Sequence, residues 1–154
     1  MIEIRIVSFE VKSMLTFKRI LFYIVSVTWG ALLSIPGLII MLCLLPFGRV
    51  KVYHGRLCGV VGSGWGGFNL GCCFLVCKEA QNSDYTCGHE CGHGLQNCLW
   101  GPLTPFVITI PSAVRYWYRN WALAKGKKLP DYDAIWFEGQ ATEWGKKYVI
   151  TDKI

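Results

Sequence analysis

The sequence predicts a mainly α-helical protein with a small β element, built as a single membrane-associated domain. Three observations support this fold class. The chain has 154 residues, which suits one domain with one core. Apolar residues make up 53% of it and charged residues only 17%, whereas soluble domains average about 25% charged residues. Residues 20–48 contain no charged side chain, and about 20 apolar residues are enough to span a bilayer.

Residues 20–48 are the predicted membrane segment. The apolar run is longer than the roughly 7–15 residues of a secretory signal and lacks its small-residue cleavage site, so we expect it to be retained. Pro36 and Gly37 lie in its middle and predict either one kinked span or a re-entrant hairpin with halves too short to cross separately. A buried core helix is the remaining alternative.

Basic residues flank the apolar segment on both sides and do not by themselves orient it. A denser basic run lies later in the chain, has no acidic residue within it and favours a cytoplasmic location for that part of the chain: Arg115, Arg119, Lys125, Lys127 and Lys128. It predicts that the C-terminal half of the chain is cytoplasmic. The net charge of +6 fits this topology and anionic lipid better than nucleic acid, for which no binding module is recognisable.

Residues 56–80 are predicted to form a glycine-rich loop followed by a strand. The glycines disfavour a helix, and residues 68–77 form the candidate strand. Polar and apolar residues do not alternate along it, which predicts that both of its faces are covered. The eight cysteines are expected to be free thiols in a reducing compartment, and adjacent Cys72 and Cys73 fit small apolar packing better than a disulfide.

Residues 84–100 are predicted to form a helix, with N-cap candidates before it and the Gly101-Pro102 pair at its end. Residues 101–122 follow as an interfacial or re-entrant element that three prolines are expected to break: Pro102, Pro105 and Pro111. The stretch "RYWYRNW" has the composition of a membrane-interface belt, and a plain aromatic packing surface is the alternative. Residues 131–149 are predicted to form the last helix, from Tyr132 onward.

The helix at residues 84–100 carries a zinc-binding motif. His89, Glu90 and His93 spell H-E-x-x-H. Positions i and i+4 of a helix share a face, so the two imidazoles can point at one metal ion. Glu90 lies beside that face, where a general base can reach water next to the metal. The sequence therefore predicts Zn²⁺ bound by two histidines, with Glu90 as the catalytic residue.

Neighbours on the histidine face support this prediction. Gly92 permits the close approach of another backbone, and Gln96 can orient a ligand by a hydrogen bond. Gly88 and Gly92 also form the small-x-x-x-small pattern of closely packed helices.

The third zinc ligand is predicted to be Glu138 on the last helix. The residues three, four and seven positions after it are small, so this face can press on the zinc helix: Ala141, Thr142 and Gly145. Glu143 is followed at the helical spacings by lysines, as on a solvated ion-paired face. Asp131 and Asp133 are runners-up in a turn where capping is the ordinary role. His54 stands alone and is expected to be an interface residue.

The segments "HECGH" and "FEGQATEWG" resemble integral-membrane metallopeptidases of the gluzincin type, in particular the CaaX-prenyl-protease and heat-shock membrane-protease families. The resemblance implies that His89, His93 and Glu138 are zinc ligands and that Glu90 is the base. Thr142 stands where those families have an aspartate beside the ligands, and it becomes the candidate for that supporting role.

The run "GHECGHGLQNCLWGPLTPFVITIPS" also resembles small uncharacterised bacterial membrane proteins with an H-E-Y-G-H-x-x-Q core, in which Cys91 replaces tyrosine. This likeness covers about residues 66–146 and implies a bacterial inner-membrane protein.

A membrane-associated zinc peptidase that hydrolyses a peptide or protein substrate is the function these patterns predict. The resemblance implies that residues 68–77 are the edge strand along which a peptide lies. Tyr132 and Tyr148 are candidates for the oxyanion helper because they lie near the last helix. Two alternatives remain: a non-catalytic zinc-stabilised scaffold or immunity component, and a membrane protein without metal.

Overall fold

The computed structural model describes residues 16–150 and confirms a mainly helical chain with a small sheet. The main helices are the segment Thr16–Thr28, α2 (Ala31–Leu44), α3 (Asp84–Trp100), α4 (Ile110–Ala124) and α5 (Trp136–Gly145). Short 3-10 turns lie at Leu45–Phe47, Gly101–Leu103 and Tyr132–Ala134, and π-helical turns at Pro105–Thr109 and Lys146–Ile150. The strands are β1 (Val50–Tyr53), β2 (Arg56–Val60), β3 (Gly67–Leu70) and β4 (Cys73–Val76).

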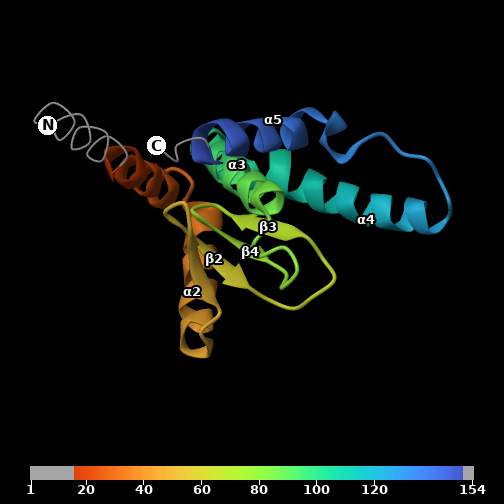
Figure 1. Ribbon diagram of the computed structural model, residues 1–154. Helices are drawn as coiled ribbons and strands as arrows, with labels where there is room; N and C mark the ends of the chain where they lie inside the picture. Colours follow the sequence, from red (N-terminus) through yellow and green to blue (C-terminus); the bar gives the residue numbers. More distant parts are fainter. Residues whose placement is uncertain (1–15, 151–154) are drawn as a thin grey trace, which may run out of the picture.

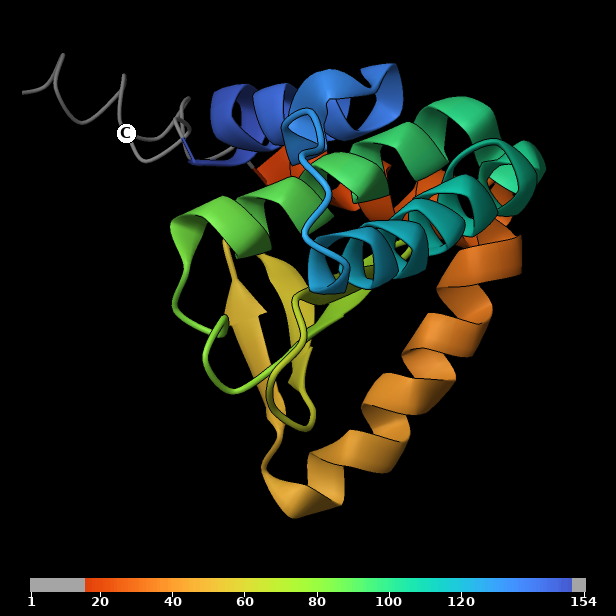
Figure 2. The same ribbon diagram turned by 90° about the vertical axis from the view of Figure 1, so that its right-hand side faces the viewer.

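Helix α3 lies at the centre of the molecule. In Figures 1 and 2 it lies between the sheet on one side and α5 on the other. Its contact with α5 is unusually close. A Cβ on Gly92 would lie 1.9 Å from the Ala141 backbone oxygen, and one on Gly145 would lie 1.9 Å from the Gly88 oxygen. The predicted pressing of small faces is therefore observed, and it allows side chains from both helices to meet.

The sheet has four strands in the order β1-β2-β4-β3, with β2 and β4 parallel and the other pairs antiparallel. The predicted single strand at residues 68–77 is wrong, because the chain turns back at Gly71 and Cys72 to make the β3–β4 hairpin. Gly71 has φ +69°, and a Cβ there would lie 2.2 Å from the Ser34 hydroxyl oxygen, so only glycine fits this turn. The central strand β4 is almost fully buried, as the lack of alternation predicted.

The apolar segment 20–48 is bent at a different place from the one predicted. Pro36 lies inside α2, whereas a bend of 105° separates Thr16–Thr28 from Ala31–Phe47. The bend is held by α3, because Asn97 Nδ2 donates to the Gly30 oxygen at 3.2 Å. Within residues 16–150, no single helix has both the length and the hydropathy needed to span a membrane, although this bent pair passes that test by length and composition.

Residues 101–122 do not form one continuous α-helix, as the three prolines predicted, but are divided into a 3-10 turn, a π-helical turn and most of α4. Each proline lies in the first turn of a helical element, where its missing N–H is not needed. Of the four aromatic residues in the predicted belt, Trp117, Tyr118 and Trp121 are about half exposed or more, and Tyr116 is partly buried. The last helix begins later than predicted, at Trp136, after a separate turn at Tyr132–Ala134.

All eight cysteines are free, and most are buried. Cys58, Cys87 and Cys91 pack in one apolar cluster between β2, β4 and α3, while Cys72 and Cys73 pack in a second cluster beneath α2. These five cysteines serve as small apolar side chains in the core. The first cluster holds α3 on the sheet.

Candidate metal centre

Two histidines reach the candidate site from one face of α3. This helix begins as predicted because the Ser83 hydroxyl accepts a hydrogen bond from the Thr86 N–H at 3.2 Å. His89 and His93, one turn apart, are both buried, and their Nε2 atoms are 3.1 Å apart. The two rings are nearly perpendicular.

Helix α5 supplies a carboxylate to the same point. Glu138 is fully buried, and its Oε2 lies 3.1 Å from His89 Nε2 and 3.2 Å from His93 Nε2. The three ligand atoms lie within 4.8 Å of one another, so this group could hold a metal ion. Burial alone would raise the pKa of Glu138, but hydrogen bonds with the two rings outweigh it and hold that pKa well below its usual range.

Gln96 fixes the orientation and tautomer of His93. Its Nε2 donates to the Phe137 oxygen at 2.8 Å and to Gln140 Oε1 at 2.9 Å, so its Oε1 must face the imidazole. That oxygen lies 2.7 Å from His93 Nδ1 and accepts a hydrogen bond from its N–H. His93 Nε2 therefore turns a lone pair toward Glu138.

Thr142 fixes His89 in the same way. Its hydroxyl donates to Asp133 Oδ1 at 3.0 Å and so accepts from His89 Nδ1 at 2.7 Å. Tyr85 donates to the other carboxylate oxygen of Asp133 at 3.1 Å. The carboxylate that supports His89 thus comes from the turn before α5 and acts through Thr142. The sequence suggested Asp133 only as a ligand or a cap. Its contact with Thr142 depends on how the turn folds back onto α5, which no local pattern reveals.

With both rings neutral, these tautomers leave three acceptors facing one another with no proton between them. Two imidazole lone pairs and a carboxylate oxygen meet at 3.1–3.2 Å. Such a cluster is repulsive unless a cation lies among its members. A proton is one such cation: although burial opposes the charged ring, the hydrogen bond with Glu138 raises the pKa of His93. A divalent metal ion is the other, and it would be bound by all three groups at once.

Glu90 lies beside the ligand cluster without belonging to it. Its side chain is buried against β3, where a Cβ on Gly67 would lie 2.5 Å from Glu90 Oε1. Asn69 of the same strand donates to the Glu90 backbone oxygen at 2.8 Å and so ties β3 to α3. Within residues 16–150, Glu90 Oε2 is buried without a hydrogen-bond partner. Burial raises the pKa of Glu90, with a smaller opposing effect of the two histidines.

A small pocket of about 40 Å³ opens beside the histidines and Glu90. Its walls come from β3, from the start of α4 and from the turn before α5, including Phe68, Ser112 and Tyr132. Ordered water needs roughly 10–15 Å³ and a few polar partners, so this pocket can hold water next to Glu90. Burial raises the pKa of Tyr132 to about 12, which keeps its hydroxyl protonated as a hydrogen-bond donor.

The remaining sequence candidates lie away from this pocket. Glu143 is exposed on the opposite side of α5, and His54 lies in the β1–β2 turn with φ 46°. Asp131 takes no part in the ligand cluster, and its backbone oxygen accepts from Arg115 at 3.0 Å. Tyr148 is half exposed and lines a different cavity. Ser112 was missed by sequence reasoning, because its position depends on how α4 packs.

Comparison with known proteins gives no relatives: no protein-family model, curated protein or solved structure matches this chain.

Proposed function

We propose that this chain is a membrane-associated zinc-dependent peptidase. The observation that carries the proposal is the convergence of His89, His93 and Glu138 at 3.1–3.2 Å, with the Glu90 carboxylate beside them in a pocket. Two imidazoles and one carboxylate form a donor set that zinc favours in hydrolytic enzymes.

The spacing of the donors supports zinc in particular. Ligand atoms at about 2.0–2.1 Å from a tetrahedral ion are roughly 3.3 Å apart, close to the separations of this cluster. Three protein ligands leave the fourth position of a tetrahedral ion open, as in catalytic zinc sites. The supporting hydrogen bonds from Gln96 and Thr142 to the outer ring nitrogens are also typical of such sites.

The surrounding residues can then be assigned roles in peptide hydrolysis. A zinc ion in this site would supply a Lewis acid that activates water and polarises a carbonyl. Glu90 would take a proton from water in the pocket and deliver it to the leaving amine, and its raised pKa suits both transfers. Tyr132 would donate a hydrogen bond to the developing oxyanion. Strand β3, an edge of the sheet beside Glu90, offers backbone groups to an extended peptide.

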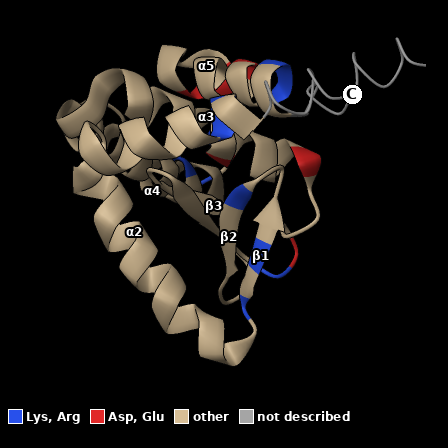
Figure 3. Ribbon diagram, turned by 90° about the vertical axis from the view of Figure 1, so that its left-hand side faces the viewer, with Lys and Arg blue, Asp and Glu red and all other residues tan. Residues whose placement is uncertain are grey.

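Membrane association is proposed from the surface of the helices. The sequence of α2 contains no charged residue, and Figure 3 shows this helix without blue or red. Large apolar side chains are exposed along it, among them Leu32, Ile39 and Leu42. Trp117 and Trp121 on α4 add exposed aromatic rings of the kind found at membrane interfaces. By the resemblance in sequence, the membrane would be a bacterial inner membrane, and by the basic run from Arg115 to Lys128 the site would lie on its cytoplasmic side.

The test is metal analysis combined with peptidase assays on purified variants. The wild type should carry one zinc ion per chain and cleave an unfolded protein substrate such as casein. Glu90→Gln should keep the metal and lose activity by about 100-fold or more. Glu138→Gln should lose the metal, whereas Glu143→Gln on the exposed side of α5 should keep both properties. Full activity in Glu90→Gln would remove the proposed base, and a wild type without metal would remove the zinc site.

A non-catalytic zinc-stabilised membrane protein is the second candidate. It is favoured by the burial of the ligands and by the small size of the pocket, which limits access for a substrate. In that case Glu90→Gln would change neither metal content nor any activity, while His89→Ala would unfold the protein. The same set of variants therefore separates the two functions.

A further inference from the structure

A second cavity, of about 660 Å³, lies outside the metal centre. It opens to the surface and is lined by the helical segment Thr16–Thr28, the β1–β2 turn, the C-terminal half of α3, the end of α5 and the π-helical turn after it. None of its lining residues contributes to the pocket beside Glu90. Its volume falls within the range of about 300–1,000 Å³ that is typical of ligand sites.

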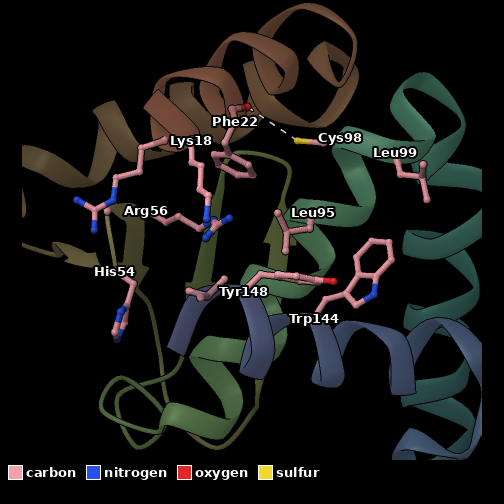
Figure 4. Close-up of a pocket in the computed structure, with 12 residues that line it drawn as sticks. Lys18, Phe22, His54, Arg56, Leu95, Cys98, Leu99, Trp144 and Tyr148 are labelled. Atoms are coloured by element: carbon pink, nitrogen blue, oxygen red, sulfur yellow. Dashed lines mark hydrogen bonds between the residues drawn. The ribbon is translucent and has the colours of Figure 1, made fainter. Parts of the chain in front are cut away.

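One side of this cavity is apolar. Phe22, Leu95, Leu99 and Trp144 line it, and they come from three different helices. Figure 4 shows Leu95, Leu99 and Trp144 together on one side of the cavity, away from His54 and Arg56. A wall of this kind fits a hydrocarbon chain.

The other side of the cavity is cationic. Lys18, Arg19 and Arg56 line it, and no aspartate or glutamate does. Within residues 16–150, none of these three side chains forms an ion pair with a carboxylate. The Arg56 guanidinium lies 4.1 Å from the centre of the Phe22 ring, and its Nε is buried without a hydrogen-bond partner in the described part of the chain. Cations that have no carboxylate partner among residues 16–150 and lie beside an apolar wall create a strong preference for a negative charge.

We infer that this cavity binds an anionic lipid. The headgroup anion contacts Lys18, Arg19 and Arg56, and an acyl chain lies against Phe22, Leu95, Leu99 and Trp144. Neither the cationic side nor the apolar wall alone requires an amphiphile. Together they match an anionic lipid, whose charged headgroup and apolar acyl chain are joined in one molecule. The same Thr16–Thr28 segment exposes large apolar side chains outside the cavity, namely Phe17, Ile20 and Ile24, so a lipid can enter from a surrounding bilayer. The inference does not depend on the proposed peptidase activity.

Native mass spectrometry of the full chain in a neutral detergent tests this site. The probes are phosphatidylglycerol and phosphatidylcholine with identical acyl chains, and glycerol phosphate as the free headgroup anion. The wild type should retain phosphatidylglycerol and neither of the other two. Arg56→Gln and Lys18→Gln should each weaken its binding by at least about tenfold, the effect of losing one charge-assisted hydrogen bond. Lys128→Gln, which removes an exposed charge outside the cavity, should bind like the wild type.

A substitution on the apolar wall tests the acyl chain separately. Leu99 is 58% exposed and lines the cavity, so Leu99→Trp can fill it while the fold is kept. This variant should also lose phosphatidylglycerol. Equal retention of phosphatidylcholine, equal weakening by Lys128→Gln, or equal retention of glycerol phosphate would each overturn the inference. Since Lys18 is exposed, Lys18→Gln remains informative even where Arg56→Gln misfolds.

Discussion

The orientation of each histidine in the candidate metal centre is set by a residue outside the ligand cluster. The Gln96 side-chain oxygen accepts a hydrogen bond from His93. The Thr142 hydroxyl accepts a hydrogen bond from His89 and donates one to Asp133. Because the outer nitrogen of each ring bonds to Gln96 or Thr142, both inner nitrogens point toward Glu138 and toward the position that a metal ion would take. The ring orientations therefore exist before any metal binds.

Replacing Thr142 by valine tests this support. Thr142→Val keeps the side-chain shape but removes the acceptor for His89 Nδ1, so zinc affinity should fall by about 10–100-fold. Asp133→Asn should weaken binding as well, and the double variant should be little worse than Thr142→Val, because both residues act through one hydrogen bond. Zinc affinity is measured by competition with a chromogenic chelator. Thr28→Val, whose exposed hydroxyl bonds only to its own helix, is the control, and an equal loss there would contradict the assignment.

The buried carboxyl group of Glu90 makes stability depend on pH in the metal-free protein. Since burial raises its pKa, the folded chain holds this proton more tightly than the unfolded chain, whose carboxyl pKa is about 4.3. The stabilisation that comes from holding this proton is therefore complete at a pH below the unfolded-state pKa of about 4.3. It is lost as the pH rises from there through the raised pKa of folded Glu90. Metal-stripped Glu90→Gln should unfold at a higher temperature than the wild type at pH 8, with a smaller difference at pH 4.5.

Thermal unfolding followed by circular dichroism in the presence of a chelator measures this difference. Glu143→Gln, an exposed carboxylate on α5, should show no comparable advantage at pH 8. A wild type more stable than Glu90→Gln at pH 8 would show that Glu90 is stabilised in its charged form by groups other than a metal.

At the scale of elements, the site depends on the close packing of α3 and α5. Both contact points join a glycine to a backbone carbonyl, Gly92 to Ala141 and Gly145 to Gly88. The ligands lie beside these contacts: His89 lies between Gly88 and Gly92 and His93 directly follows Gly92 on α3, while Glu138 lies one turn before Ala141 on α5. Any separation of the two helices moves the carboxylate away from both rings at once.

Gly92→Ala tests this dependence. The added methyl would overlap the Ala141 backbone, so the helices must separate, and the free energy of unfolding should fall by about 1–3 kcal/mol. Zinc content should fall with it, since the distance from Glu138 to the rings increases. Gly66→Ala is the matched control, because a Cβ there meets nothing within 4 Å. Chemical denaturation and metal analysis report the two effects, and unchanged zinc binding in Gly92→Ala would separate the site from this packing.

At the scale of the whole molecule, apolar surface is concentrated on the bent helix pair and on α4. Along α2, exposed Leu32, Ile35, Ile39 and Leu42 follow one another at helical spacings. Arg115 of α4 has a structural role that the sequence did not indicate. Arg115 donates to the Asp131 and Tyr132 oxygens and so holds the turn that carries Asp133.

Vesicle flotation tests the proposed membrane contact of α2. The purified chain should float with vesicles of phosphatidylethanolamine and phosphatidylglycerol. Ile39→Lys should reduce the floated fraction, because a lysine near the bilayer centre costs about 2.5–3.5 kcal/mol. Asn82→Lys adds the same charge to an exposed turn before α3 and should float like the wild type. Both variants should keep the wild-type zinc content, and equal flotation of Ile39→Lys would remove α2 from the membrane contact.

The sequence by itself determined those features that depend on local chemistry. The bounds of α3 follow from Ser83 and the Gly101-Pro102 pair, and the spacing of His89 and His93 places both rings on one face of that helix. Small residues after Glu138 were enough to predict which face of the last helix meets α3. Each of these signals lies within a few residues of the feature that it predicts.

Only the tertiary structure decided the features that depend on contacts between distant segments. Asn97 holds the bend at Gly30 rather than at Pro36, and the Ser34 hydroxyl packs against the Gly71 turn that splits the predicted strand in two. Asp133 reaches the metal centre through Thr142 because a turn folds back onto α5. Such contacts join residues far apart in the chain or on different elements, so no local pattern encodes them.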